Sequence, residues 1–231
     1  MRALVVRTRN LPAVAAGVPV SSPGARRPAM LAAPVAVPVS MTAVFALLRR
    51  RLSRRAAYTA GFAVYWAGWC VAFPMWVLGP DGVVRVLRSG RWPGRLDVAL
   101  LAFPVIGAVG AELWPQRRLV DRRTAAVMIG TAAVNAVGEE LLWRGTFLDQ
   151  FRGDVIRGAV WPLAGFTVWH LAPQLILPSS RGRAGFLLGA AVVGAACTAA
   201  AWRTGGLRYV LLPHVLTDAC GVGAARFWLG R

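Results

Sequence analysis

The chain has 231 residues, of which 57% are hydrophobic and 16% are charged, and its mean hydropathy is +0.54. This apolar share exceeds that of an ordinary soluble domain, and the length excludes a large soluble domain beside one membrane domain. The net charge of +18 comes from arginine alone, because there is no lysine. The arginines cluster between apolar runs without a nucleic-acid-binding motif, so we expect contacts with membrane lipids and none with nucleic acid.

Residues 1–55 are predicted to form a basic N-terminal region outside the main domain. Residues 1–29 are rich in Arg, Pro, Ala and Val without a helical period, which favours a disordered tail or an over-extended start of the reading frame. The apolar segment 30–48 contains two prolines. The sequence does not decide whether this segment is an extra membrane span, a signal-like segment or a segment at the membrane interface.

Six apolar runs of near-membrane length follow and predict an all-α, polytopic transmembrane helix bundle over residues 56–231. A span needs roughly 20 residues, and isolated strands would leave unpaired backbone groups in hydrocarbon. The count is six spans, or seven if 30–48 also crosses. The runs are 56–78, 96–114, 124–147, 158–177, 184–202 and 208–229.

The arginine flanks predict the orientation and the location. The cluster 49–55 favours a cytoplasmic flank, which gives an N-in, C-in topology for six spans. The first outside loop also carries four arginines, so the difference in arginine content between inside and outside loops is small there. We expect an integral membrane protein, in the cytoplasmic membrane of a bacterium.

Charged residues within the third run point to chemistry. Glu139, Glu140 and Arg144 follow a long apolar stretch, where each charge costs at least about 2.5–3.5 kcal/mol on insertion scales. The two histidines of the chain, His170 and His214, also lie in apolar runs. Such a combination favours a polar catalytic cluster inside the bundle.

Helical rise predicts that these groups share one layer of the membrane. From the helix ends that face the loop 148–157, Glu139 lies at a depth of about 13 Å and His170 at about 18 Å. His214 and Asp218 lie at about 9 and 15 Å in the sixth run. Antiparallel connection places all three helix ends on the same membrane face, so the groups are expected to meet.

The helical spacing of these residues predicts a different role for each of them. Glu140 and Arg144 stand at i,i+4, the spacing of a same-face ion pair, whereas Glu139 points about 100° away and is free to act as a general base. His170 is expected to share a water molecule with Glu139. His214 and Asp218, again at i,i+4, are expected either to stabilise an oxyanion or to hold a metal.

Plainer interpretations exist for each residue. Glu140 and Arg144 alone could be a structural ion pair. Each histidine could be a buried core residue whose ring is hydrogen-bonded to a backbone carbonyl, and Asp218 could pair with an arginine. The tryptophans are interpreted as membrane-interface and packing residues. The cysteines, Cys70, Cys197 and Cys220, are interpreted as small core residues. The joint occurrence of the polar residues in one layer favours the catalytic interpretation.

At these residues the sequence resembles the CAAX-processing and bacteriocin-processing (CPBP) family of intramembrane proteases, which includes the type II CAAX prenyl endopeptidases. The family pattern is Glu-Glu-x-x-x-Arg, then Phe-x-x-x-His, then His-x-x-x-Asn or a similar polar residue, on separate membrane helices. Here the pattern reads Glu139, Glu140 and Arg144, then Phe166 and His170, then His214 and Asp218. The resemblance covers residues 96–229, the expected catalytic core.

The resemblance implies hydrolysis of a peptide bond within the membrane. Glu139 with His170 would activate the attacking water, Glu140 and Arg144 would support the site, and His214 with residue 218 would stabilise the oxyanion. Asp218 departs from the family pattern, because an ionised carboxylate repels an oxyanion. Asp218 is therefore protonated, orients His214, or binds a cation.

The resemblance leaves metal dependence open. A divalent cation such as Zn²⁺ could be held by His170, His214 and Glu139, but no His-Glu-x-x-His motif supports such a site. We expect metal to be non-essential and expect no other cofactor.

The expected substrate and partner is a membrane-associated or lipid-modified peptide or protein. A catalytically idle immunity or scaffold protein of the same fold is the main alternative. A small proton-coupled transporter is less favoured, because the sequence shows no inverted repeat.

Overall fold

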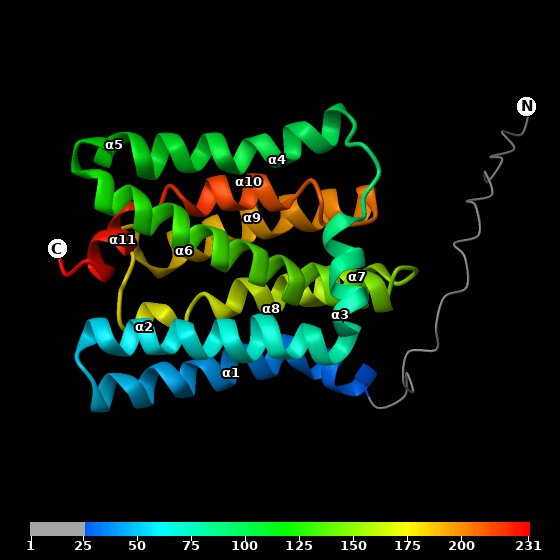
Figure 1. The fold of residues 1–231 in the computed structure, drawn as a ribbon, viewed down its shortest axis with the longest axis horizontal. Helices are drawn as coiled ribbons and strands as arrows, with labels where there is room; N and C mark the ends of the chain where they lie inside the picture. The colour runs from blue at the N-terminus through cyan, green and yellow to red at the C-terminus, as the bar shows by residue number, and fades with distance from the viewer. Residues whose placement is uncertain (1–25) are drawn as a thin grey trace, which may run out of the picture.

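The computed structural model describes residues 26–231, and all the regular secondary structure in this range is helical. Figure 1 shows most helices running along one common direction, with α1 and α2 at one edge of the bundle and α4 at the opposite edge. The all-α helix bundle predicted from the sequence is therefore confirmed. The predicted disordered tail, residues 1–29, lies outside the described residues except for its last four positions.

In the part of the chain that the structure describes, five helical segments are long and apolar enough to cross a membrane. The first segment is α1 (Arg26–Arg51), and the second consists of α2 (Arg54–Val64), π-helical η1 (Tyr65–Ala72) and α3 (Phe73–Arg88). The third consists of α4 (Arg95–Ala108), π-helical η2 (Val109–Leu113), α5 (Trp114–Gln116) and 3₁₀-helical η3 (Arg117–Leu119). The fourth consists of α6 (Arg122–Glu140), π-helical η4 (Leu141–Gly145) and α7 (Thr146–Gln150), and the fifth is α9 (Gly182–Thr204). Each begins with an arginine except α9, so basic residues flank the apolar stretches.

The fourth and sixth predicted runs are shorter and broken. The fourth comprises π-helical η5 (Ile156–Val160), α8 (Trp161–Trp169) and 3₁₀-helical η6 (Pro173–Leu175), and the sixth comprises α10 (Leu211–Asp218) and α11 (Val222–Trp228). Helix α8 ends at Trp169, and a turn over residues 170–172 leads to Pro173, with Ala172 still in the α conformation. These short helices hold the histidines, and they are not among the five candidate spans.

Helix α1 contains the apolar segment 30–48, whose membrane role the sequence left open. The helix runs without interruption through Pro34 and Pro38, both of which are buried. It packs against α2 and α8. A Cβ atom at Gly165 of α8 would lie 2.6 Å from the Cα of Pro34, so only glycine allows this approach. The segment is thus one of the five candidate spans and part of the bundle.

The outer surface is apolar, as expected of a protein in lipid. Phe103, Ile106, Leu188 and Leu212 each expose 64–70% of their area. Exposure of so many large apolar side chains to water would be unfavourable, whereas hydrocarbon accommodates them. Together with the five apolar helices, this surface identifies an integral membrane protein.

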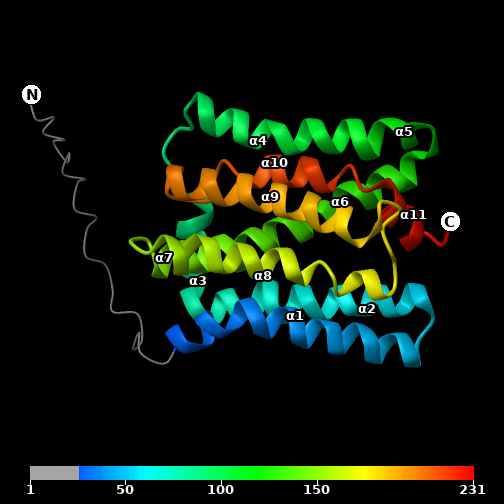
Figure 2. The ribbon, with the colours of Figure 1, turned by 180° about the vertical axis from the view of Figure 1, so that it is seen from behind.

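The short helices lie inside the arrangement. Helix α10 packs against both α6 and α4, and α8 packs against both α1 and α9. Figure 2 shows the same order from behind, with α8 and α9 between the α1–α2 edge and the α4 edge. Helix α6 therefore meets α10 in the interior, and η4, which continues α6, contacts α8.

The contact between α8 and α1 predicts a strong effect of one methyl group. Gly165→Ala should lower the melting temperature of the protein in detergent, because overpacking against backbone costs about 1–3 kcal/mol. Gly130→Ala on α6 is the matched control, since a Cβ there meets nothing within 4 Å. Equal melting temperatures for the two variants would contradict the described packing.

Candidate active site

Glu139 and Glu140 end α6, and both side chains are almost completely buried, with 1% and 0% exposed. Despite being neighbours they have different partners. Glu140 Oε1 lies 3.2 Å from Arg144 Nη1, which is the i,i+4 ion pair predicted from the sequence. A buried carboxylate of this kind is stable only when it is paired and hydrogen-bonded.

Arg144 is held from three sides. Its Nε donates to Thr198 Oγ1 at 3.2 Å, and its Nη2 donates to the carbonyl oxygen of Gly194 at 3.1 Å. The guanidinium lies over the ring of Phe166, 4.2 Å from the ring centre. A Cβ on Gly194 would approach this ring to 2.7 Å, so a glycine is required for α9 to come this close.

Glu139 is bound through one oxygen only. Its Oε1 accepts hydrogen bonds from the Tyr65 hydroxyl at 3.1 Å and from Trp169 Nε1 at 2.8 Å. Trp143 Nε1 donates to the Tyr65 hydroxyl at 2.9 Å and so fixes its direction. Oε2 of Glu139 is buried and accepts no hydrogen bond from the described residues. One oxygen of Glu139 is therefore fixed and the other is available.

Sequence reasoning missed these aromatic donors. Tyr65 lies in the first predicted run, 74 positions before Glu139, and no pattern connects the two. Trp143 and Trp169 were interpreted as interface and packing residues, but both donate hydrogen bonds into the site. The sequence signal for a role of Trp143 and Trp169 in the site was that they directly adjoin Arg144 and His170.

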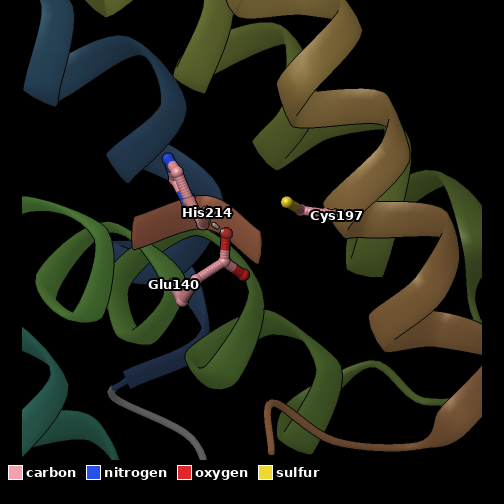
Figure 3. Close-up of side chains that lie close together, drawn as sticks. All are labelled: Glu140, Cys197 and His214. Atoms are coloured by element: carbon pink, nitrogen blue, oxygen red, sulfur yellow. Dashed lines mark hydrogen bonds and ion pairs between the residues drawn. The ribbon is translucent and has the colours of Figure 1, made fainter. Parts of the chain in front are cut away.

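His214 lies between the carboxylates. Its Nδ1–H donates to Glu140 Oε1 at 2.7 Å, while its Nε2 lies 3.7 Å from Glu139 Oε2 and 3.6 Å from Asp218 Oδ1. Figure 3 shows the bond between His214 and Glu140, with Cys197 on the neighbouring helix pointing towards the Glu140 carboxylate. Pro213 stands in the first turn of α10, where its missing N–H leaves no helical bond unmade.

Asp218 is held by a residue that sequence reasoning also missed. Asn135 Nδ2 donates to Asp218 Oδ2 at 2.9 Å, and Trp66 Nε1 donates to Asn135 Oδ1 at 3.0 Å. Since Trp66 can only donate, it fixes which end of the amide faces Asp218. Asn135 precedes Glu139 by four residues, so its place on the same helix face was a usable signal.

His170 makes no direct contact with Glu139 among the contacts of the described residues. It follows the end of α8, and its Nδ1–H donates to the carbonyl oxygen of Phe166 at 2.7 Å. Its Nε2 is therefore the acceptor nitrogen of a neutral ring. No hydrogen bond or ion pair joins it to Glu139 in the part of the chain that the structure describes. The histidine beside Glu139 is His214.

Among residues 26–231, two groups of three side chains could hold a metal ion. One comprises Glu140, Cys197 and His214, and the other comprises Glu139, His214 and Asp218. In each group the ligand atoms lie within 4.8 Å of one another. His170, part of the metal-ligand set predicted from the sequence, belongs to neither group.

Residues 121–220 match the sequence model of the family described as type II CAAX prenyl endopeptidase Rce1-like. This stretch, less than half of the chain, is similar to an Rce1-like domain. This domain extends from the first residue before α6 to just beyond α10, and it contains all six predicted site residues. The finding agrees with the resemblance read from the motifs. No curated protein and no solved structure matches the chain.

The Rce1-like segment does not contain the whole site. Tyr65 and Trp66, which contact Glu139 and Asn135, lie on the second membrane segment and outside residues 121–220. The close approach of the two parts depends on Gly138, where a Cβ would lie 2.7 Å from the Cβ of Cys70. Helix η1 and the end of α6 are therefore in direct contact.

The surroundings of Arg144 predict a large loss of stability for Arg144→Ala. The substitution leaves Glu140 charged and without its cationic partner, which costs about 3–5 kcal/mol for a buried pair. The yield of folded protein and its melting temperature in detergent measure this loss. Arg157→Ala is the matched control, because its ion pair with Asp154 is exposed. A melting temperature unchanged by Arg144→Ala would contradict the described ion pair.

Proposed function

We propose that this protein is an intramembrane endopeptidase that hydrolyses a peptide bond in a membrane-associated or lipid-modified substrate. The observation that carries the proposal is the unbonded Oε2 of Glu139, which is buried beside His214 Nε2 in an Rce1-like domain. A carboxylate oxygen with no partner in an apolar interior is expensive. Such an oxygen is well suited to accept a proton from a water molecule bound next to it.

Glu139 is assigned the role of general base. In the proposed reaction the oxygen of water attacks the carbonyl carbon of the scissile bond while Oε2 accepts the proton of that water. The proton then passes to the leaving amine nitrogen as the carbon–nitrogen bond breaks, which yields a carboxylic acid and an amine. Tyr65 and Trp169 occupy Oε1, so they hold the carboxylate in one orientation and direct its free oxygen to the water.

His214 is assigned the stabilisation of the developing oxyanion through its Nε2–H. The ring can do this only if it is correctly oriented. Glu140 accepts from Nδ1, and Arg144 in turn pairs with Glu140, so these two residues act as positioning residues. His170 keeps the role implied by the family resemblance, as a second contact to the attacking water. Its neutral ring offers Nε2 as an acceptor for that water.

The substrate class follows from the membrane setting. The site lies among helices whose outer surface is apolar, which favours a substrate that reaches it through lipid. A prenylated C-terminus, a leader peptide and a damaged membrane protein all meet this requirement. We place the enzyme in a bacterial cytoplasmic membrane, with lipids and the substrate protein as its partners and no nucleic acid.

A catalytically idle immunity or scaffold protein of the same fold is the alternative. Asp218 favours it, because an ionised carboxylate 3.6 Å from His214 Nε2 opposes the formation of an oxyanion there. Cleavage by the purified protein would exclude this alternative. A proton-coupled transporter would instead accumulate solute in vesicles.

The general-base assignment predicts that Glu139→Gln abolishes cleavage without loss of folding. The amide cannot accept the proton, but it keeps the shape of the side chain and its contact with the two aromatic donors. General bases contribute about 10²–10⁴-fold to a rate. The measurement is mass spectrometry of a pooled peptide library, anchored in liposomes that contain the purified wild type or the variant.

Glu112→Gln is the control for this comparison, since Glu112 pairs with Arg181 outside the site. It should cleave like the wild type. Cleavage at the wild-type rate by Glu139→Gln would exclude the proposed mechanism. His170→Ala should also lose cleavage, and an unchanged rate would remove His170 from the mechanism.

A further inference from the structure

An open groove lies on the outer surface of the bundle, between α2 and the end of α11. It has a volume of about 470 Å³, and its lining includes Ser53, Arg55, three alanines of α2 and Trp228. Figure 1 shows the start of α2 and the whole of α11 at the same end of the bundle. None of the residues of the candidate active site lines this groove. It is therefore a separate feature of the molecule.

The walls of the groove are apolar and held in place. Ala56, Ala60 and Ala63 line it, and their spacing of four and three residues puts them on one face of α2. Their small side chains leave room for a ligand. The ring of Trp228 borders this face and packs against the ring of Tyr58, with 5.3 Å between the ring centres. A flexible hydrocarbon chain fits such a surface.

The length and position of the groove match one leaflet of a membrane. From Arg55 to Ala63 the helix rises by about 12 Å, and half of the hydrocarbon core of a bilayer is about 15 Å thick. The end at Arg55 belongs to the basic segment 49–55, and tryptophan, as at Trp228, is enriched at membrane interfaces. The Arg55 end therefore lies at the level of lipid headgroups, and the Ala63 end lies among acyl chains.

Two hydrogen-bond donors stand at the headgroup end without an acceptor. Within residues 26–231, no hydrogen bond or ion pair involves the guanidinium of Arg55, which lies against Gly230. The Ser53 oxygen accepts from the backbone N–H of Ala56 at 3.3 Å, which leaves its hydroxyl hydrogen free to donate. Both side chains line the groove. This end of the groove therefore suits an anion.

The charge around this end is positive and uncompensated. Segment 49–55 contains five arginines and no acidic residue. Arg49 Nη1 donates to the carbonyl oxygen of Leu175 at 3.0 Å, and Arg54 Nη2 donates to that of Ile176 at 2.7 Å. These acceptors are neutral, so they satisfy hydrogen bonds and leave the positive charge. Clusters of this kind attract anionic lipids, and a phosphate group can accept two parallel N–H bonds from one arginine.

A second groove on the same membrane segment lacks these features. It has a volume of about 380 Å³ and is lined by Val64, Gly68, Trp69, Phe73 and Trp76. None of these side chains carries a charge, so nothing in the second groove selects one lipid headgroup over another. Only the groove at Arg55 combines a channel for a hydrocarbon chain with unpaired donors for an anion.

We propose that the groove at Arg55 binds one anionic phospholipid. The phosphate accepts hydrogen bonds from the Arg55 guanidinium and the Ser53 hydroxyl, and one acyl chain lies along the alanines of α2 beside Trp228. The bound lipid contacts both α2 and α11. Because α11 also packs against α6, the lipid supports the contact between the second membrane segment and the helix that carries Glu139. Its binding does not depend on the proposed peptidase activity.

Native mass spectrometry of the full-length protein in detergent tests the choice of headgroup. Protein stripped of lipid should bind phosphatidylglycerol more tightly than phosphatidylcholine with the same acyl chains. Arg55→Gln should weaken the binding of phosphatidylglycerol about tenfold, because it removes a charge-assisted contact. Arg50→Gln is the matched control, since it removes the same charge from the same basic segment but does not line the groove. It should bind phosphatidylglycerol as the wild type does.

Several outcomes of this titration would overturn the proposal. Equal binding of the two lipids by the wild type would do so. Equal losses in Arg55→Gln and Arg50→Gln would show attraction to the basic segment as a whole. Displacement of phosphatidylglycerol by an equal concentration of inorganic phosphate would show an anion site that does not recognise the acyl chain. Preferential binding of farnesol, an uncharged isoprenoid, would assign the groove to an isoprenoid chain.

The position of the acyl chain has its own measurement. One equivalent of phosphatidylglycerol with brominated acyl chains should quench the fluorescence of the wild type more than that of Trp228→Phe. Ala63→Trp should fill the groove and weaken lipid binding. Ala67→Trp is its control, because Ala67 is exposed and lines neither groove. Equal quenching in the wild type and Trp228→Phe, or equal lipid binding by the two alanine variants, would place the chain elsewhere and overturn the proposal.

Discussion

The buried ion pair between Glu140 and Arg144 is the interaction on which the rest of the site depends. Two charges in an apolar interior are stable only together, and only when their remaining hydrogen-bonding groups are satisfied. Arg144 is bound through its Nε and Nη2 to Thr198 and Gly194 of α9, and Glu140 is bound through its Oε1 to His214 of α10. Arg144 Nη1 and Glu140 Oε2 form no hydrogen bond with the described residues. The pair therefore joins α6, α9 and α10, and the orientation of the histidine is a consequence of it.

The neighbouring Glu139 is placed by a different set of contacts. Its fixed oxygen is held by Tyr65 from the second membrane segment and by Trp169 from α8. Tyr65 lies outside the Rce1-like segment, so the helices that precede this domain complete the site. Two adjacent glutamates on one helix thus face different partners, because successive residues on a helix point about 100° apart. Each carboxylate has one oxygen without a hydrogen bond from the described residues. That of Glu139 lies 3.7 Å from His214 Nε2, whereas Glu140 is held in the ion pair with Arg144.

Much of the arrangement could be predicted from the sequence because helical geometry is local. The pairing of Glu140 with Arg144 follows from their spacing, and the meeting of α6 with α10 follows from the expense of isolated charge in lipid. The helix ends near Pro173 and Pro213 were harder to predict, since apolar composition continues through them. The sequence therefore predicted two continuous spans where the structure has short, broken helices.

Contacts between distant helices could not be predicted. Nothing in the sequence connects Tyr65 with Glu139, because that contact depends on tertiary packing at Gly138. The same limit applies to the histidines, which the sequence predicts to lie in one layer with Glu139. Which of them lies beside Glu139 is decided by side-chain directions at the end of α8. His170 donates instead to its own helix, so His214 takes this position.

The most direct test of this account compares the thermal unfolding of Glu139→Gln and Glu140→Gln in the same detergent. Glu140→Gln removes the partner of Arg144 and leaves a buried guanidinium uncompensated, so its melting temperature should fall well below that of the wild type. Glu139→Gln removes one of three crowded carboxylates and should melt at or above the wild-type temperature. Equal destabilisation by both substitutions, or greater destabilisation by Glu139→Gln, would contradict the division of roles between the two glutamates.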